Sequence, residues 1–322
     1  MEQNNSNNSS WFIMMSAVKQ YYQLGFSQEQ IARNLFISKS TVSRLIKKAV
    51  DLGYVEIKVK SFGEFDELLQ ESLEKKYNIK CYVLPTLVNQ SNVRLNDVCA
   101  FAAQKIFSAI EDNEIIILPW GKTAEYLAAN LNIPHKKDGV KLCMMNGFVS
   151  GSTDSLKAIH IIEKLSDMLG AEGYIMPCPL IMGNKETKDI IMEDPSIKKV
   201  NSLIRESSTI VFSVGPFDMR NTYLSELGED VIKELMSLQN AAGNLAGRTY
   251  DINGREFQTN YSSRLTGLPL RDLKTKQKRI CVAVGNYKAK AILGLLRGGF
   301  ITELYTESET AREILREEAK LS

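Results

Sequence analysis

Residues 27–52 have the sequence SQEQIARNLFISKSTVSRLIKKAVDL, and this stretch decides the fold of the amino-terminal part of the chain. Ser27 and Gln30 have the spacing of a capping box, in which each side chain satisfies a free backbone N–H of the other, so a helix is predicted to start there. Ser38 can cap a second helix over 39–52. Two helices joined by so short a turn predict a helix-turn-helix.

The second predicted helix has two chemically different faces. Its apolar side chains recur at i, i+3, i+4 and i+7, which predicts a packed stripe of Val42, Leu45, Ile46 and Ala49. The same pattern shifted by two residues, about 200° around the axis, carries hydroxyls and cations: Ser40, Ser43, Arg44 and Lys47. Hydroxyls and Arg near a helix N-terminus suit base edges, whereas Lys suits phosphates, so this face predicts DNA binding. A small helical bundle with a solvated charged face is the alternative.

The flanking segments extend the prediction. Residues 11–24 predict a first helix with an apolar stripe that includes Phe12, Met15, Val18 and Tyr22. Residues 54–60 alternate as a strand does, which is consistent with a short wing, and residues 1–10 predict a disordered tail. Phe36 stands in the turn where glycine often supplies a positive φ; it implies either backbone strain or a different turn.

Charge is concentrated in the same region. Between Trp11 and Lys60 there are eight Lys or Arg and three Asp or Glu, an excess of five positive charges, while the whole chain carries a net charge of only +2. A basic module attached to a nearly neutral body suits a polyanionic partner for the first part alone.

Length and composition limit the class of protein. A chain of 322 residues suits two domains, and 44% hydrophobic with 24% charged residues predicts globular folding. The start lacks the order of a secretory signal, and no apolar run approaches a membrane span. Five scattered cysteines predict buried reduced thiols and a cytoplasmic location. With two distant histidines, His135 and His160, neither a metal site nor a histidine-dependent catalytic triad is expected.

From residue 61 onward the pattern changes. Residues 61–78 predict a charged linker helix. After it, apolar strands are expected at 81–84, 115–118, 141–145, 174–176, 210–214, 280–284 and 301–306. Helices are expected at 97–110, 123–130, 155–169, 228–238, 287–296 and 308–319. This alternation predicts a three-layer α/β/α domain over 79–322 with a mainly parallel sheet.

Several predicted strands end in small or polar residues. These ends include 120–123, Asn146-Gly147, Val214-Gly215 and 285–288. Ligands of such folds bind beyond the carboxyl ends of the strands, where glycines admit a backbone N–H to an anion and a Lys neutralises it. A phosphorylated small molecule is the expected ligand, although the need for a tight turn would also explain each glycine.

The amino-terminal motif resembles the DNA-binding domain of the SorC/DeoR-type bacterial sugar-responsive regulators. The resemblance rests on Tyr21-Tyr22, Ser27-Gln28, Ile31-Ala32, Leu35, Ile37-Ser38 and Thr41-Val42-Ser43-Arg44-Leu45. With the motif's polar positions, it implies DNA contacts from Gln28, Ser38, Lys39, Ser40, Thr41, Ser43, Arg44 and Lys47.

The body resembles the effector domain of the same regulators, which is similar in fold to sugar-phosphate isomerases and CoA-transferases. Landmarks are Trp120-Gly121-x-Thr123, Asn146-Gly147, Ala242-Gly243-Asn244-Leu245 and Lys288-Ala289-x-Ala291-Ile292. The resemblance implies an effector site made by Gly121, Lys122, Thr123, Asn146, Gly147, Gly215, Arg220, Asn244 and Lys288. Residues 121–123 and Lys288 would hold the phosphate of a sugar or polyol.

Three positions depart from the family pattern. Lys122 stands where Thr or Ser is common, Asn244 where an acidic residue is common, and Asn286 where a second glycine is common. One branch of the family uses a lysine near Asn146 to form a Schiff base with its ligand. Asn has no nucleophilic amine, so covalent capture at that position is not expected here.

The sequence therefore predicts a transcriptional regulator, with a repressor favoured over an activator. Its expected partners are operator DNA, a small phosphorylated sugar or polyol and further copies of itself, as a dimer or tetramer. The alternatives are a sugar-phosphate isomerase with a basic appendage and an oligomeric scaffold without ligand. No convergent acid and base can be placed at the strand ends, which argues against the enzyme. No cofactor or P-loop is expected, because Ile116 stands where a P-loop needs its first glycine.

Overall fold

The computed structural model describes residues 2–55, 65–148, 154–218 and 227–321. The chain divides into two compact units, Met1–Ser61 and Phe62–Ser322. Each unit has hydrophobic clusters of its own. Within the described residues, no helix is both long and apolar enough to cross a membrane.

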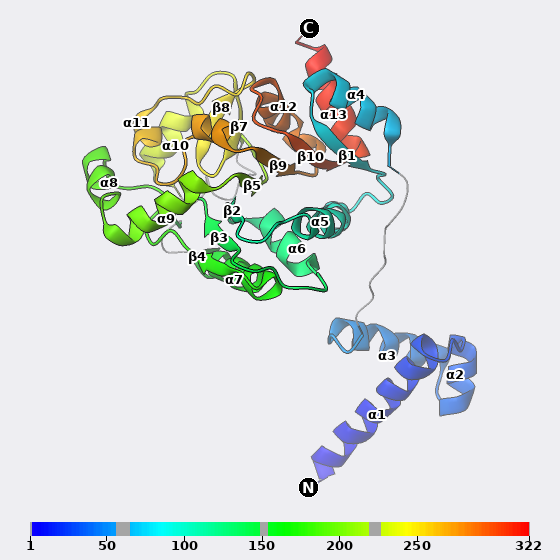
Figure 1. Ribbon diagram of the computed structural model, residues 1–322. Helices are drawn as coiled ribbons and strands as arrows, with labels where there is room; N and C mark the ends of the chain where they lie inside the picture. Colours follow the sequence, from blue (N-terminus) through cyan, green and yellow to red (C-terminus); the bar gives the residue numbers. More distant parts are fainter. Residues whose placement is uncertain (1, 56–64, 149–153, 219–226, 322) are drawn as a thin grey trace. The chain divides into compact units, whose positions relative to one another are not determined.

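The first unit contains the helices α1 (Glu2–Tyr22), α2 (Gln28–Leu35) and α3 (Lys39–Asp51) (Figure 1). The capping box forms as predicted: the Gln30 side chain accepts from the Ser27 N–H at 2.8 Å, and Ser27 Oγ accepts from the Gln30 N–H at 3.3 Å. Ala17, Ile31, Val42 and Ile46 form one buried cluster between the three helices. This arrangement confirms the predicted helix-turn-helix.

The first helix of this unit differs from the sequence prediction. Helix α1 begins at Glu2 and so includes residues 2–10, for which the sequence predicted a disordered tail. The buried face of α1 consists of Met14, Ala17 and Val18, whereas Phe12 and Tyr22 are exposed. The proposed wing over 54–60 lies mostly outside the described residues.

In the described part of the second unit, parallel strands form a seven-stranded sheet in the order β1-β10-β9-β5-β2-β3-β4. The strands are β1 (Lys80–Leu84), β2 (Ile115–Leu118), β3 (Lys141–Met144), β4 (Glu172–Tyr174), β5 (Thr209–Phe212), β9 (Lys278–Val282) and β10 (Glu303–Glu307). Each corresponds to a predicted strand, with β4 and β9 displaced by two residues toward the amino terminus.

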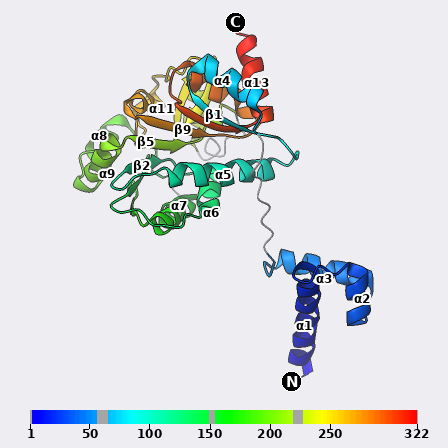
Figure 2. The same ribbon diagram turned by 45° about the vertical axis from the view of Figure 1, so that its right-hand side comes forward.

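Helices cover both faces of this sheet (Figures 1 and 2). One face carries α5 (Ser91–Ser108), α6 (Lys122–Asn130) and α7 (Asp154–Leu169), and the other carries α4 (Glu67–Tyr77), α9 (Pro195–Glu206), α12 (Ala289–Arg297) and α13 (Ser308–Ala319). Along β2 the side chains alternate between the two faces. Ile116 and Leu118 pack in the core beneath α5, α6 and α7, and Ile117 packs in the core on the opposite face. The predicted three-layer α/β/α architecture is confirmed.

The segment predicted as a linker helix belongs to the second unit. Helix α4 packs on β1 and α13, its Leu73 is fully buried, and Glu74 Oε1 accepts from the Cys81 N–H at 2.9 Å. Its apolar residues at helical spacing therefore serve the core.

A second, antiparallel sheet was not predicted. It consists of β6 (Gly215–Pro216), β7 (Ala241–Leu245) and β8 (Arg248–Asp251), near α10 (Glu229–Met236) and α11 (Asn260–Ser263). The structure also contains α8 (Lys185–Ile191), η2 (Leu270–Thr275) and η3 (Asn286–Lys288). The β7–β8 hairpin turns through Ala246 and Gly247, both with positive φ. Asn-Gly is the usual sequence signal for such a turn. Because Ala246 stands where Asn would be expected, the sequence did not reveal this hairpin.

All five cysteines are buried and free, as predicted. Burial raises the pKa of the Cys143 thiol to about 12. A thiol with so high a pKa remains protonated at neutral pH and is a poor nucleophile, so these residues serve as small apolar side chains.

Candidate functional site

Helix α3 presents the exposed polar face that the sequence predicted. Ser40, Ser43, Arg44 and Lys47 are exposed, while Val42, Ile46 and Ala49 are buried against the other helices. Leu45 is half-buried. The polar face and the packing face therefore lie on opposite sides of one helix.

Hydroxyl groups gather at the first turn of α3. Ser38 Oγ accepts from the Thr41 N–H at 3.1 Å and lies 2.8 Å from both Ser40 Oγ and Thr41 Oγ1. The Arg44 guanidinium donates to Thr41 Oγ1 at 3.4 Å. Ser38 is thus occupied as the helix cap, and Thr41 helps to orient Arg44.

The remaining predicted DNA contacts differ in their surroundings. The Lys39 ammonium is paired with Glu29 of α2, and this hydrogen bond lowers the pKa of Glu29. Gln28, in the first turn of α2, is half-buried. Lys39 would have to leave Glu29, or share it, to bind a phosphate.

Phe36 has a strained backbone. It follows α2 with φ 54° and ψ 40°, the left-handed region, and its side chain is 95% exposed. For a residue with a Cβ, this conformation costs about 1–2 kcal/mol. Of the two alternatives that the sequence left open, the structure shows the strained one.

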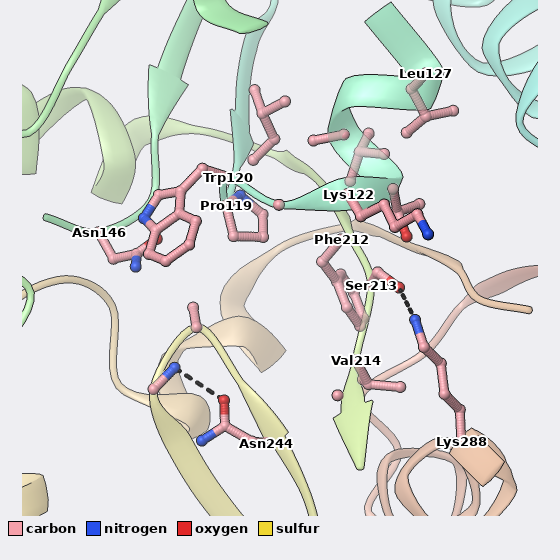
Figure 3. A pocket seen from close by; sticks show the side chains of 18 of the residues that line it. Pro119, Trp120, Lys122, Leu127, Asn146, Phe212, Ser213, Val214, Asn244 and Lys288 are labelled. Atoms are coloured by element: carbon pink, nitrogen blue, oxygen red, sulfur yellow. Dashed lines mark hydrogen bonds between the residues drawn. The ribbon is translucent and has the colours of Figure 1, made fainter. Parts of the chain in front are cut away.

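A cavity of about 370 Å³ lies at the carboxyl ends of β2 and β5 in the second unit. These neighbouring strands connect onward in opposite directions, β2 to β3 on one side and β5 to β9 on the other. Such a switch point leaves a crevice between the two loops, which is where open α/β sheets bind ligands. Figure 3 shows side chains from both loops facing this space.

One side of the cavity is cationic. Lys122, in the first turn of α6, donates to Asn92 Oδ1 at 2.8 Å, and Lys288 lies 3.4 Å from Ser213 Oγ. Burial lowers the pKa of Lys288, and the neighbouring Lys122 lowers it further. Gly121 caps α6 with φ 138°, and the first turn leaves its N–H groups without helical partners. This side can hold an anion.

The other side carries amides. Asn146 is 2% exposed, and its Oδ1 has no hydrogen-bond partner in the described structure. Asn244 Oδ1 accepts from the Gly247 N–H at 3.1 Å and so holds the β7–β8 turn. The described lining includes two lysines and neither Asp nor Glu. A ligand with a hydroxyl donor would satisfy Asn146.

The structure brings most of the predicted effector residues together. The cavity lining contains Gly121, Lys122, Thr123, Asn146, Gly215, Asn244 and Lys288. Gly147 is absent from the described lining: a Cβ there would meet Cys178 O at 2.2 Å, and its own carbonyl accepts from the Trp120 indole N–H at 3.0 Å. Arg220 lies outside the described residues.

The lining residues that were not named as site residues include Trp120, Ser213 and Tyr287. Ser213 follows β5 directly and lies 3.4 Å from Lys288, and Trp120 lies two residues after the end of β2. A polar or aromatic residue close to the carboxyl end of a buried strand was the available signal.

Comparisons with known proteins match both units of the chain. Residues 63–316 match the family model described as "Putative sugar-binding domain", and residues 21–60 match the MarR family. The chain belongs to the SorC/DeoR-type family of sugar-binding transcriptional regulators.

Relatives in this family align over nearly the whole chain. The deoxyribonucleoside regulator of Bacillus subtilis is 28% identical, over 95% of this chain and 97% of its own length. The sorbitol operon regulator of Klebsiella pneumoniae is 26% identical, over 94% and 98%. The crystal structure of the full-length Klebsiella regulator superposes with a TM-score of 0.73, at 25% identity and over 94% of this chain and 97% of that one.

Family membership decides between the functional alternatives. The relatives are transcriptional regulators, so this chain is a DNA-binding transcriptional regulator with a sugar-binding domain. The alternative of a sugar-phosphate isomerase is wrong.

Proposed function

We propose that the protein represses a carbohydrate-utilisation operon and is controlled by a small phosphorylated sugar or polyol bound in the cavity. The observation that carries the proposal is that Lys122, Lys288 and the amino terminus of α6 all line the cavity, and that the described part of its lining has no carboxylate. A phosphate would gain from both ammonium groups and from the helix N-terminus. Asn146 and Asn244 would face the hydroxyl groups.

The effector is tested by thermal shift with a panel of sugar phosphates, polyols and polyol phosphates. Phosphorylated compounds should raise the melting temperature of the second unit most. Lys288→Ala should weaken the binding of the best compound by about 10- to 100-fold, because a hydrogen bond to a charged group contributes about 1.5–3 kcal/mol. Lys290→Ala, which removes an exposed lysine two residues further along the chain, is the matched control. Full binding by Lys288→Ala, or a preference for neutral polyols, would contradict the proposed phosphate site.

We infer that DNA is contacted by Gln28, Ser38, Lys39, Ser40, Thr41, Ser43, Arg44 and Lys47, with Arg44 reading a base. The expected assembly is a dimer or tetramer, because two recognition helices must lie about 34 Å apart to read adjacent half-sites on one face of the duplex. It would act in the cytoplasm, where operator DNA lies.

A mobility-shift assay with a duplex carrying an inverted repeat tests this interface. Affinity should fall steeply as salt rises, because bound phosphates release counterions. Arg44→Ala should cost about 1–3 kcal/mol and relax the preference at one base position. Lys75→Ala, which removes an exposed charge from α4, is the control. An equal loss on every sequence would make Arg44 a phosphate contact instead.

The first turn of α13 offers a route by which the effector could act on the first unit. The Gly285 N–H, three residues before Lys288, donates to Thr310 Oγ1 at 2.7 Å, and Ser308 Oγ donates to Asp66 Oδ2 at 2.9 Å. Asp66 stands where the described chain enters the second unit. One helical turn therefore binds both the cavity loop and the chain that leads from the DNA-binding unit. We infer that effector binding shifts this turn and, with it, the population of DNA-binding assemblies.

A further inference from the structure

We propose that the ring of Phe36 contacts the apolar surface of duplex DNA, either a thymine methyl group or a deoxyribose. The proposal rests on DNA binding by the first unit and adds a contact that the helix-turn-helix pattern does not supply.

The left-handed backbone at Phe36 is an exception within this chain. Five described residues other than glycine have positive φ: Asn78, Asn113 and Asn240, which tolerate that region, together with Phe36 and Ala246. Ala246 lines the cavity. In the same unit as Phe36, the two other turns use Gly25 and Gly53 for this conformation. Strained residues cluster at functional sites, and Phe36 has the larger side chain of the two exceptions.

Packing within the chain does not compensate for this strain. The Phe36 side chain is 95% exposed, although its neighbour Ile37 packs against the buried cluster of the unit. A glycine would make the same turn without strain and without an exposed ring. The ring therefore contributes nothing evident to the fold, and a partner of the folded protein is the remaining use for it.

The position of Phe36 favours DNA as that partner. It lies two residues before Ser38, the cap of α3, and recognition helices enter the major groove with their amino-terminal end. The exposed side chains nearby in sequence include Arg33 and Arg44, whose charge complements a polyanion. The apolar groups that a duplex offers to a phenyl ring are the thymine methyl in the groove and the sugar beside it.

The test uses the full-length chain and duplexes that the wild-type protein selects from a random 30-base-pair pool. Phe36→Asn keeps a residue that tolerates the left-handed backbone, and Phe36→Gly removes the strain. Both should lower affinity by about 5- to 50-fold, while Phe36→Gly raises the melting temperature of the first unit by about 4 °C. Leu24→Asn, which removes another exposed apolar side chain from this unit, should change nothing.

Replacing thymine by deoxyuracil in the selected duplex identifies the contacted group. If the wild type loses affinity and Phe36→Asn does not, the ring contacts a thymine methyl; if both respond alike, it contacts a deoxyribose. Wild-type affinity in Phe36→Asn and Phe36→Gly would overturn the proposal, and a lower oligomeric mass of these variants would then assign the ring to a contact between copies of the chain. Failure of the wild type to bind any duplex would instead refute DNA binding itself.

Discussion

The two units of this protein build their sites in opposite ways. The first unit places its polar groups on the exposed face of one helix, where Ser40, Ser43 and Arg44 follow the helical period. The second gathers its groups from separate strand ends, and Asn146 and Asn244 are buried. A site that binds a large polyanion must be convex and exposed to solvent, whereas a site for a small molecule gains specificity by enclosing its ligand. The two units are therefore expected to respond differently to perturbation.

The largest expected effect is the destabilisation of the first unit by a core substitution that leaves the second unit folded. Ile31 is fully buried between the three helices of the first unit, so Ile31→Ala should destabilise that unit by about 2–5 kcal/mol. Calorimetry should show an early transition for the first unit and an unchanged one for the second, with DNA binding lost and effector binding retained. A single transition that shifts as a whole would show that the units unfold together.

The pH dependence of effector binding sharpens the contrast between an exposed and an enclosed cation. Burial lowers the pKa of Lys288 in the free protein, and a bound anion would favour the charged form. Affinity for a phosphate should therefore fall as pH rises above the lowered pKa, by up to about tenfold per pH unit. Calorimetric titration between pH 7.5 and 10 measures this, and Lys288→Arg should give a flat profile because Arg stays charged. Identical profiles would exclude Lys288 as the titrating group.

A smaller effect tests whether the units communicate through α13. Thr310→Val removes the acceptor of the Gly285 N–H while keeping the shape of the side chain. The effector should still raise the melting temperature, but its influence on DNA affinity should change by about 0.5–2 kcal/mol. The comparison of DNA affinity with and without the compound selected by thermal shift measures this. Unchanged coupling would place the route elsewhere.

The smallest effect concerns the second strained residue. Ala246→Gly should relieve its left-handed backbone and stabilise the second unit by about 1 kcal/mol, which raises its melting temperature by about 2–4 °C. The Asn244 side chain still holds the turn in this variant. If Phe36→Gly stabilises its unit and Ala246→Gly does not, contacts inside the cavity wall already compensate for the strain at Ala246.

The sequence determined most of the features that depend on a local period, although the apolar stripe predicted for α1 was wrong at Phe12 and Tyr22. The capping residues Ser27 and Ser38, the two faces of α3 and the strands of the parallel sheet all follow from neighbours within a few residues. A helix start or a buried strand has a local physical cause, either a side chain that satisfies free N–H groups or a run of apolar residues that excludes water. The family resemblance named in advance the lysines and buried amides of the cavity lining, Lys122, Asn146, Asn244 and Lys288.

Only the tertiary structure decided what depends on long-range contacts. Three features join residues far apart in the chain. They are the antiparallel sheet that carries Asn244, the contact between Ser213 and Lys288, and the packing of α4 on the second unit. Their formation is governed by packing and by the satisfaction of buried polar groups, which leave no period in the sequence. The left-handed backbone at Phe36 was also decided by the tertiary structure. The sequence was compatible with either a strained backbone or a different turn, and the packing of α2 against α3 is made with the strained backbone.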